Sequence, residues 1–137
     1  NWRNSDKVVK VVYSRPSLKG RSLAKLAPND KVWRTGANES AVITFYKDVI
    51  FGGKKVKKGT YSLYTIPTEG DWTIILSNQL NYWGSYFYKQ DQDVVRVNGA
   101  VSKVEDSIEA FSMMFDKNMT LKMGWEHTVV SVPITVK

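Results

Sequence analysis

The sequence predicts an all-β fold, an antiparallel β-sandwich of the jelly-roll or immunoglobulin-like kind. Apolar residues recur at every second position over most of the chain, which is typical of strands with one buried and one exposed face. Turn-forming residues interrupt these runs at Gly52-Gly53, Glu69-Gly70-Asp71 and Asp116-Lys117-Asn118. Segments with helical spacing are scarce. These observations together predict about nine or ten short strands joined by tight connections.

The alternation places the expected strands in chain order. The alternating sets are Val9, Val11 and Tyr13; Ala41, Ile43 and Phe45; Tyr61, Leu63 and Thr65; Trp72, Ile74 and Leu76; Val95, Val97 and Val101; Phe111, Met113 and Phe115; Met119, Leu121, Met123 and Trp125; and Val130, Val132, Ile134 and Val136. Each set is expected to form one face of its own strand.

Three further segments complete the expected fold. Pro133 cannot donate a ladder hydrogen bond, so the last strand should lie at a sheet edge or carry a bulge there. Residues 21–26 are expected to form one helical turn with Leu23 and Leu26 facing inward. Residues 77–93 form the longest irregular stretch and are rich in aromatic residues.

Length and composition indicate a single β-sandwich domain over residues 1–137. The hydrophobic fraction of 42% and the aromatic fraction of 12% are typical of a folded chain with a sizeable core. Cysteine is absent, which excludes disulfides, thiol nucleophiles and thiolate metal sites. No run of about 18 apolar residues is present, so no transmembrane segment is expected.

The chain is basic, with a formal net charge of +7 and a pI of about 9.6. This charge favours anionic partners through long-range attraction, although most of the lysines are spread along the sequence. One concentrated group, Lys54, Lys55, Lys57 and Lys58, is interpreted as a solvated hairpin that protects a strand edge from aggregation. It lacks interleaved aromatic residues, so specific nucleic-acid binding is not expected.

The inventory of reactive residues limits the available chemistry. His127 is the single histidine, which excludes sites with two or three histidine ligands within one chain. It is expected at the surface, beside the turn between the last two strands. Neither a Gly-x-Ser-x-Gly elbow nor a glycine-rich phosphate loop occurs, and no cofactor or metal is expected. A carboxylate pair that includes Glu39 remains open.

Polar and aromatic residues suggest a ligand site. The candidates are Arg15, Arg34, Asn38, Glu39, Tyr61, Trp83 and Tyr86. Arginine binds carboxylate or phosphate groups through two parallel hydrogen bonds, and exposed rings stack on sugars. The structural alternative stays open for each of them: arginines paired with internal carboxylates, a turn capped by Asn38, and loop aromatics buried within the fold.

Several motifs resemble an uncharacterised bacterial family known as domain of unknown function 2911. The motifs are Tyr13-Ser14-Arg15-Pro16, Lys19-Gly20-Arg21, Val32-Trp33-Arg34-Thr35-Gly36-Ala37-Asn38-Glu39, Gly59-Thr60-Tyr61-Ser62-Leu63, Trp83-Gly84 and Trp125. The resemblance implies an exported, β-rich domain, periplasmic or secreted, whose leader is absent from a chain that starts at Asn1. It also implies that Arg15, Arg34, Asn38, Glu39, Tyr61 and Trp83 gather at one place. It implies no catalytic role.

Three functions follow as hypotheses. The leading one is a non-enzymatic domain that binds a small polar or anionic ligand, a sugar or a carboxylate, through the arginine and aromatic side chains. The first alternative is a hydrolase that uses Glu39 with a second carboxylate. The second alternative is a structural or protein-interaction domain at the cell surface that makes contact through its aromatic loop.

Overall fold

The fold is nearly all β, as predicted. In a computed structural model of the chain, the described residues are 8–15, 17–20, 22–27, 29–33, 35, 41–78 and 93–136. Their strands are β1 (Val9–Val12), β2 (Ala41–Phe45), β3 (Val49–Phe51), β4 (Lys54–Val56), β5 (Gly59–Ile66), β6 (Trp72–Ser77), β7 (Asp93–Phe115), β8 (Leu121–Val132) and β9 (Ile134–Val136). The helix among these residues is α1 (Leu23–Leu26), the turn expected at residues 21–26, with Leu23 buried and Leu26 half-buried.

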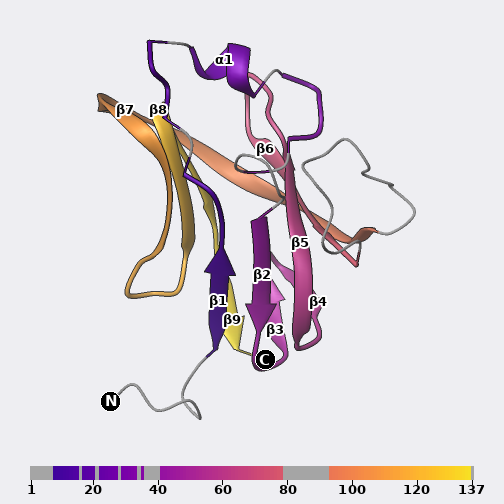
Figure 1. Cartoon of the computed structure of the whole chain (residues 1–137). Coiled ribbons are helices and arrows are strands. Elements are labelled where there is room, and N and C mark those ends of the chain that lie inside the picture. Colours follow the sequence, from indigo (N-terminus) through magenta and orange to yellow (C-terminus); the bar gives the residue numbers. More distant parts are fainter. Residues whose placement is uncertain are drawn as a thin grey trace.

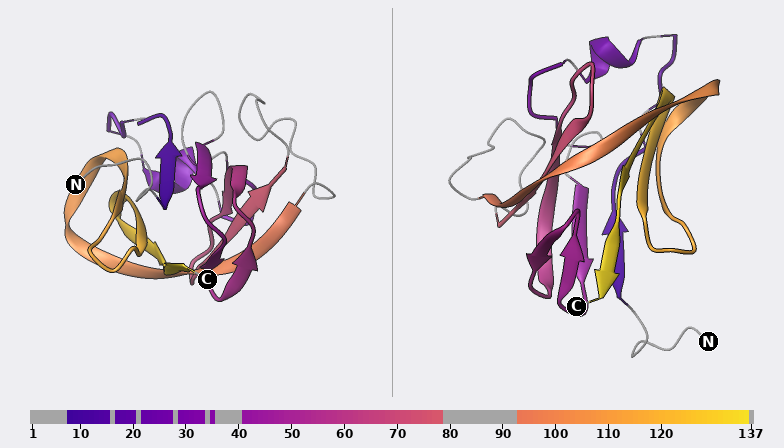
Figure 2. Two further views of the ribbon diagram at one scale, coloured as in Figure 1. Left: turned by 90° about the horizontal axis from the view of Figure 1, so that it is seen from below. Right: turned by 180° about the vertical axis from the view of Figure 1, so that it is seen from behind.

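The strands form two antiparallel sheets. The larger has the order β1-β2-β5-β6-β7-β8, and the smaller has the order β4-β3-β9. The larger sheet curls into a half-barrel, and the smaller sheet continues it through β9, which follows β8 in the chain (Figures 1 and 2). The arrangement is consistent with the predicted sandwich-like, all-β class. β9 is an edge strand directly after Pro133, which confirms the prediction made from that proline.

The core lies inside the curled sheet. The alternation in β2 puts Ala41, Ile43 and Phe45 inside, while Val42 and Thr44 are only partly buried. β5 pairs with β2 in a register that sets Ala41 opposite Leu63 and Ile43 opposite Tyr61. Inward residues therefore meet across neighbouring strands, and each ladder position adds to the same apolar cluster.

Two predicted strand pairs merge into longer strands. The sets that contain Val97 and Phe111 belong to one strand, β7, whose pairing with β8 shifts register between Lys103 and Ile108 and again between Ile108 and Ser112. The polar residues 105–107, which lie between the two predicted strands, produce an irregularity in β7 and do not end it, because β8 pairs with the chain on both sides of them. The predicted strands that contain Trp125 and Val130 are likewise one strand, β8. His127 is therefore exposed as expected, but it lies within β8 and not beside a turn.

The segment after β1 packs along the free edge of the second half of β7. Ser17 forms a bridge with Ala110, and the Leu18 N–H donates to the Glu109 carbonyl oxygen at 2.9 Å. Farther along β7, the Tyr13 hydroxyl accepts from the Met113 N–H at 2.8 Å and donates to the Met113 carbonyl at 3.2 Å. A side-chain hydroxyl thus supplies the two hydrogen bonds that a neighbouring strand would otherwise provide.

We expect Tyr13→Phe to lower the free energy of unfolding by about 1–2 kcal/mol, because both backbone groups of Met113 lose their partner while the ring packing on Phe111 remains. Urea denaturation followed by circular dichroism measures this change. Tyr46→Phe is the matched control, since the Tyr46 side chain is more than a third exposed in a turn. Equal stability of the two variants would show that the hydroxyl of Tyr13 does not hold the edge of β7.

No helix of the described residues is long and apolar enough to cross a membrane.

Candidate functional site

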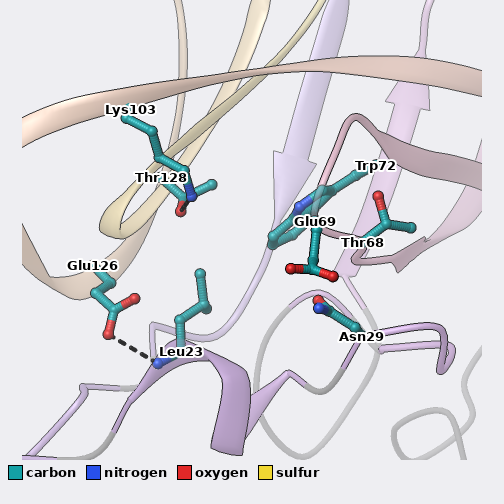
Figure 3. Close-up of a pocket in the computed structure, with 8 residues that line it drawn as sticks. All are labelled: Leu23, Asn29, Thr68, Glu69, Trp72, Lys103, Glu126 and Thr128. Carbon is teal, nitrogen blue, oxygen red and sulfur yellow. Dashed lines mark hydrogen bonds between the residues drawn. The ribbon is translucent and has the colours of Figure 1, made fainter.

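A polar cleft lies at the end of the barrel that α1 covers. It has a volume of about 250 Å³ and is lined by Leu23, Asn29, Thr68, Glu69, Trp72, Lys103, Glu126 and Thr128. Figure 3 shows Glu126 and Glu69 on opposite sides of the cleft, with Lys103 and Thr128 close to Glu126 and with Trp72 close to Glu69. The lining comes from α1 and the segment after it, the β5–β6 turn, the start of β6, β7 and β8, which the topology brings together at this end.

Glu126 occupies an unusual backbone position within β8. Its φ of 55° lies in the left-handed region, where side chains other than glycine are uncommon, and it pairs with Ile108 between the two register shifts of β7. Its Oε2 accepts the Leu23 N–H at 3.1 Å (Figure 3), so it satisfies a free donor of the first turn of α1. Among the described residues, no donor contacts Oε1, the other oxygen of this carboxylate.

The opposite wall is the turn between β5 and β6. The Thr68 hydroxyl donates to the Asp71 carbonyl at 2.7 Å and accepts from the Gly70 N–H at 3.0 Å. The Asp71 carboxylate accepts from Asn98 Nδ2 and from the Val101 N–H, each at 3.0 Å, and these hydrogen bonds hold the pKa of Asp71 below its usual value. The turn that carries Glu69 is therefore anchored to β7, and this anchoring limits the positions that the Glu69 carboxylate can reach.

Lys103 and Thr128 line the cleft as a cross-strand pair. They stand opposite each other on β7 and β8, and Lys103 Nζ donates to Thr128 Oγ1 at 3.1 Å. An ammonium group has three N–H donors, so two remain for water or a ligand. The pair therefore adds a positive charge to a cleft whose other charged lining residues are Glu69 and Glu126.

The aromatic part of the lining rests on a cluster of buried rings. Trp72 is only 6% exposed and packs edge-to-face on Trp33, with ring centroids 6.3 Å apart. Trp33 in turn stacks on Trp125 at 5.7 Å and contacts Phe111 at 5.0 Å. Within the described part of the chain, the Trp72 indole N–H has no acceptor, although Trp72 lines the cleft. The Trp72 ring is buried, and its N–H is a hydrogen-bond donor on a rigid part of the cleft wall.

Of the predicted site residues, the described part of the chain contains Arg15 and Tyr61. Arg15 Nη2 donates to Ser112 Oγ at 2.9 Å and its Nε donates to the Phe111 carbonyl at 3.3 Å, so this side chain binds β7. The Tyr61 hydroxyl donates to the Lys57 carbonyl at 2.7 Å, and burial, aided by the charge of Asp48, raises its pKa. These two side chains bond to different parts of the barrel.

The remaining predicted residues lie outside the described ones: Arg34, Asn38, Glu39, Trp83 and Tyr86. The prediction that they form one ligand site with Arg15 and Tyr61 therefore stays a prediction, and so does the carboxylate pair that includes Glu39. Trp33, next to Arg34, lies in the core and exchanges two backbone hydrogen bonds with Thr65 of β5, at 2.7 and 2.9 Å. The Trp33 part of that motif is thus structural.

The cleft residues themselves were not expected from the sequence. Glu69, Lys103 and Glu126 are far apart in the chain, and Glu126 falls on the presumed solvent face of an alternating strand. One usable signal was the run Glu69-Gly70-Asp71-Trp72, which places a carboxylate and a large ring on either side of a turn.

The fold and cleft define a class of protein: an all-β domain with a half-barrel and a small polar cleft at one end. The profile of the family described as "Protein of unknown function (DUF2911)" matches residues 2–134, so the chain belongs to that family. This confirms the resemblance seen in its motifs. No curated protein and no solved structure matches the chain.

Proposed function

We propose that this domain binds a small, uncharged, hydroxyl-rich ligand, such as one sugar unit, in the cleft at the α1 end. The observation that carries the proposal is the opposed pair Glu69 and Glu126, with Lys103 and Trp72 in the same lining. Side chains of these kinds contact hydroxyl groups, which both donate and accept hydrogen bonds.

The charge of the cleft favours a sugar over a carboxylate, the two ligand classes expected from the sequence. Two glutamates and one lysine give the described lining a formal charge of −1, which repels an organic acid. A neutral sugar has no such penalty. The net charge of +7 of the whole chain does not reverse this preference, because screening weakens the effect of charges more than about 10 Å away.

The hydrogen-bonding groups of the lining also suit a sugar. Glu126 Oε1 and the Glu69 carboxylate are acceptors, and the Trp72 N–H and the Lys103 ammonium are donors. The amide of Asn29 supplies one group of each kind. The volume of about 250 Å³ is below the usual range of about 300–1,000 Å³ for pockets that hold drug-sized ligands, which favours a single ring over an oligosaccharide.

The experiment is an isothermal titration of the whole chain with a panel of monosaccharides and, in parallel, a panel of organic acids. We expect Glu69→Gln to weaken the sugar that binds best by about 10-fold or more, since hydrogen bonds to a charged acceptor contribute about 1.5–3 kcal/mol. Trp72→Phe should weaken it as well, because the indole N–H is lost while a smaller aromatic ring still fills part of the space.

Glu105→Gln is the control, because Glu105 is exposed on β7 and does not line the cleft. This variant should bind like the parent chain. Heat from the organic acids but not from the sugars would overturn the proposal, as would a Glu69→Gln variant with unchanged affinity. Nuclear magnetic resonance spectra of the methyl glycoside of the best-binding sugar, incubated with the chain, should show it intact. Hydrolysis to the free sugar and methanol would instead favour a hydrolase, one that uses Glu69 and Glu126 in place of the pair with Glu39 expected from the sequence.

A further inference from the structure

The end of the barrel opposite α1 has a different surface. The turn between β2 and β3 holds Tyr46, Lys47 and Asp48, and the turn between β4 and β5 holds Lys57 and Lys58. Both turns lie at the end of the molecule away from α1 (Figure 1). We call the surface formed by Tyr46, Lys47, Lys55, Lys57, Lys58 and Val136 the basic end.

Hydrogen bonds and strand register hold the basic end together. Asp48 Oδ1 in one turn accepts the Lys58 N–H of the other turn at 2.9 Å. Val49, next to Asp48, pairs with Val56 of β4 on one side and with Val136 of β9 on the other. Asp48, Lys55 and Lys57 also line one hollow of about 200 Å³. These hydrogen bonds and strand pairs join the segments that contain the lysines, so the lysines belong to one surface.

The basic end combines positive charge with exposed apolar groups. Its four lysines are all exposed, and Asp48 is the one acidic residue in the two turns, which gives a formal charge of +3. Tyr46 is 38% exposed and Val136 is 46% exposed, and both are among the few large hydrophobic side chains that are exposed in the described residues. Lysines together with an exposed tyrosine and valine are typical of a surface that contacts the lipid headgroups and the adjoining ends of the acyl chains.

We propose that the basic end docks reversibly on an anionic membrane surface. The lysines would lie against lipid phosphates, and Tyr46 and Val136 would enter the headgroup layer. Each lysine close to an anionic surface strengthens binding about fivefold, so four lysines support a weak, salt-sensitive association and not a permanent anchor. The apolar pair distinguishes this partner from nucleic acid, which offers no apolar layer and would leave both groups in water.

Docking in this way would leave the cleft facing away from the membrane. β5 begins beside the lysine turn and ends just before Thr68 and Glu69, and its 8 residues span about 26 Å. The cleft would then lie farther from the membrane than about 8 Å, the screening length at physiological ionic strength, so the charge of the membrane would have little effect on binding in the cleft.

The test is co-sedimentation of the whole chain with vesicles of phosphatidylcholine alone and of phosphatidylcholine mixed with phosphatidylglycerol. We expect binding only to the mixed vesicles, decreasing as salt rises. The double variant Lys57→Glu and Lys58→Glu should weaken the partition coefficient about 25-fold or more. Tyr46→Ser should weaken binding to the mixed vesicles but leave any binding to DNA unchanged.

The matched control is the double variant Lys19→Glu and Lys31→Glu, which changes the net charge equally at exposed positions in segments around α1. This control should bind the mixed vesicles nearly as well as the parent chain. Equal loss in both double variants would overturn the proposal, because the effect would then follow net charge alone. Binding to DNA without binding to the mixed vesicles would also overturn it. Glu69→Gln should not change the vesicle result, so the ligand and membrane proposals stand or fall separately.

Discussion

Trp33→Ala is expected to lower the free energy of unfolding by about 3–5 kcal/mol. Trp33 is 7% exposed and contacts three other rings, those of Trp72, Phe111 and Trp125. Its removal leaves a cavity at the point where the segment before β2 meets β5, β7 and β8. The loss is a large share of a typical total stability of about 5–15 kcal/mol.

Guanidinium denaturation followed by far-ultraviolet circular dichroism measures this loss. Trp33→Phe should cost less, because a smaller ring still fills part of the space. Met114→Ala is the control, since Met114 is among the large side chains exposed to solvent and should cost little. If Trp33→Ala cost no more than Met114→Ala, the ring cluster would not be the support on which Trp72, and with it the cleft, depends.

Local pattern was sufficient to predict most of this fold. The alternation of Ala41, Ile43 and Phe45 identifies a buried face without knowledge of the partner strand, because the side-chain period of a strand is fixed. Gly52 and Gly53 mark the hairpin between β3 and β4 for a similar reason, since both adopt positive φ, which disfavours other residues. These are short-range properties that a sequence displays directly.

The course of β7 depends on long-range pairing, and local pattern does not reveal it. Residues 105–107 are polar and suit either a turn or an exposed bulge. What decides is β8, which pairs with Lys103 before them and with Ile108 after them. The cleft has the same origin: Glu69, Lys103 and Glu126 become neighbours only because β5, β6, β7 and β8 are adjacent in one sheet.

Gly99→Ala is the second substitution for which we expect a large loss, about 3 kcal/mol. Gly99 stands opposite Trp72 on the β6–β7 ladder. A Cβ at this position would lie 2.6 Å from Val130 Cγ1 and 2.9 Å from Ile74 Cγ1. Both neighbours are β-branched core side chains with almost no exposure, so neither can move aside without disturbing other packing. Gly70→Ala is the matched control, because its nearest neighbour, Thr68 Oγ1, is 3.9 Å away and leaves room for a methyl group.

The double variant Gly99→Ala and Val130→Ala tests the cause of that loss. Val130→Ala removes the Cγ1 atom that lies closest to the new methyl group, so the second substitution should cost less in the Gly99→Ala background than alone, by about 1–2 kcal/mol. Thermal and urea unfolding of the parent chain, the two single variants and the double variant give this coupling free energy. Additive losses would show that Val130 is not the obstacle.

Because Gly99 faces Trp72 across the ladder, Gly99→Ala should also weaken sugar binding, and Val130→Ala should restore part of it. Recovery of stability without recovery of binding would separate the packing of β6 and β7 from the placement of the indole in the cleft.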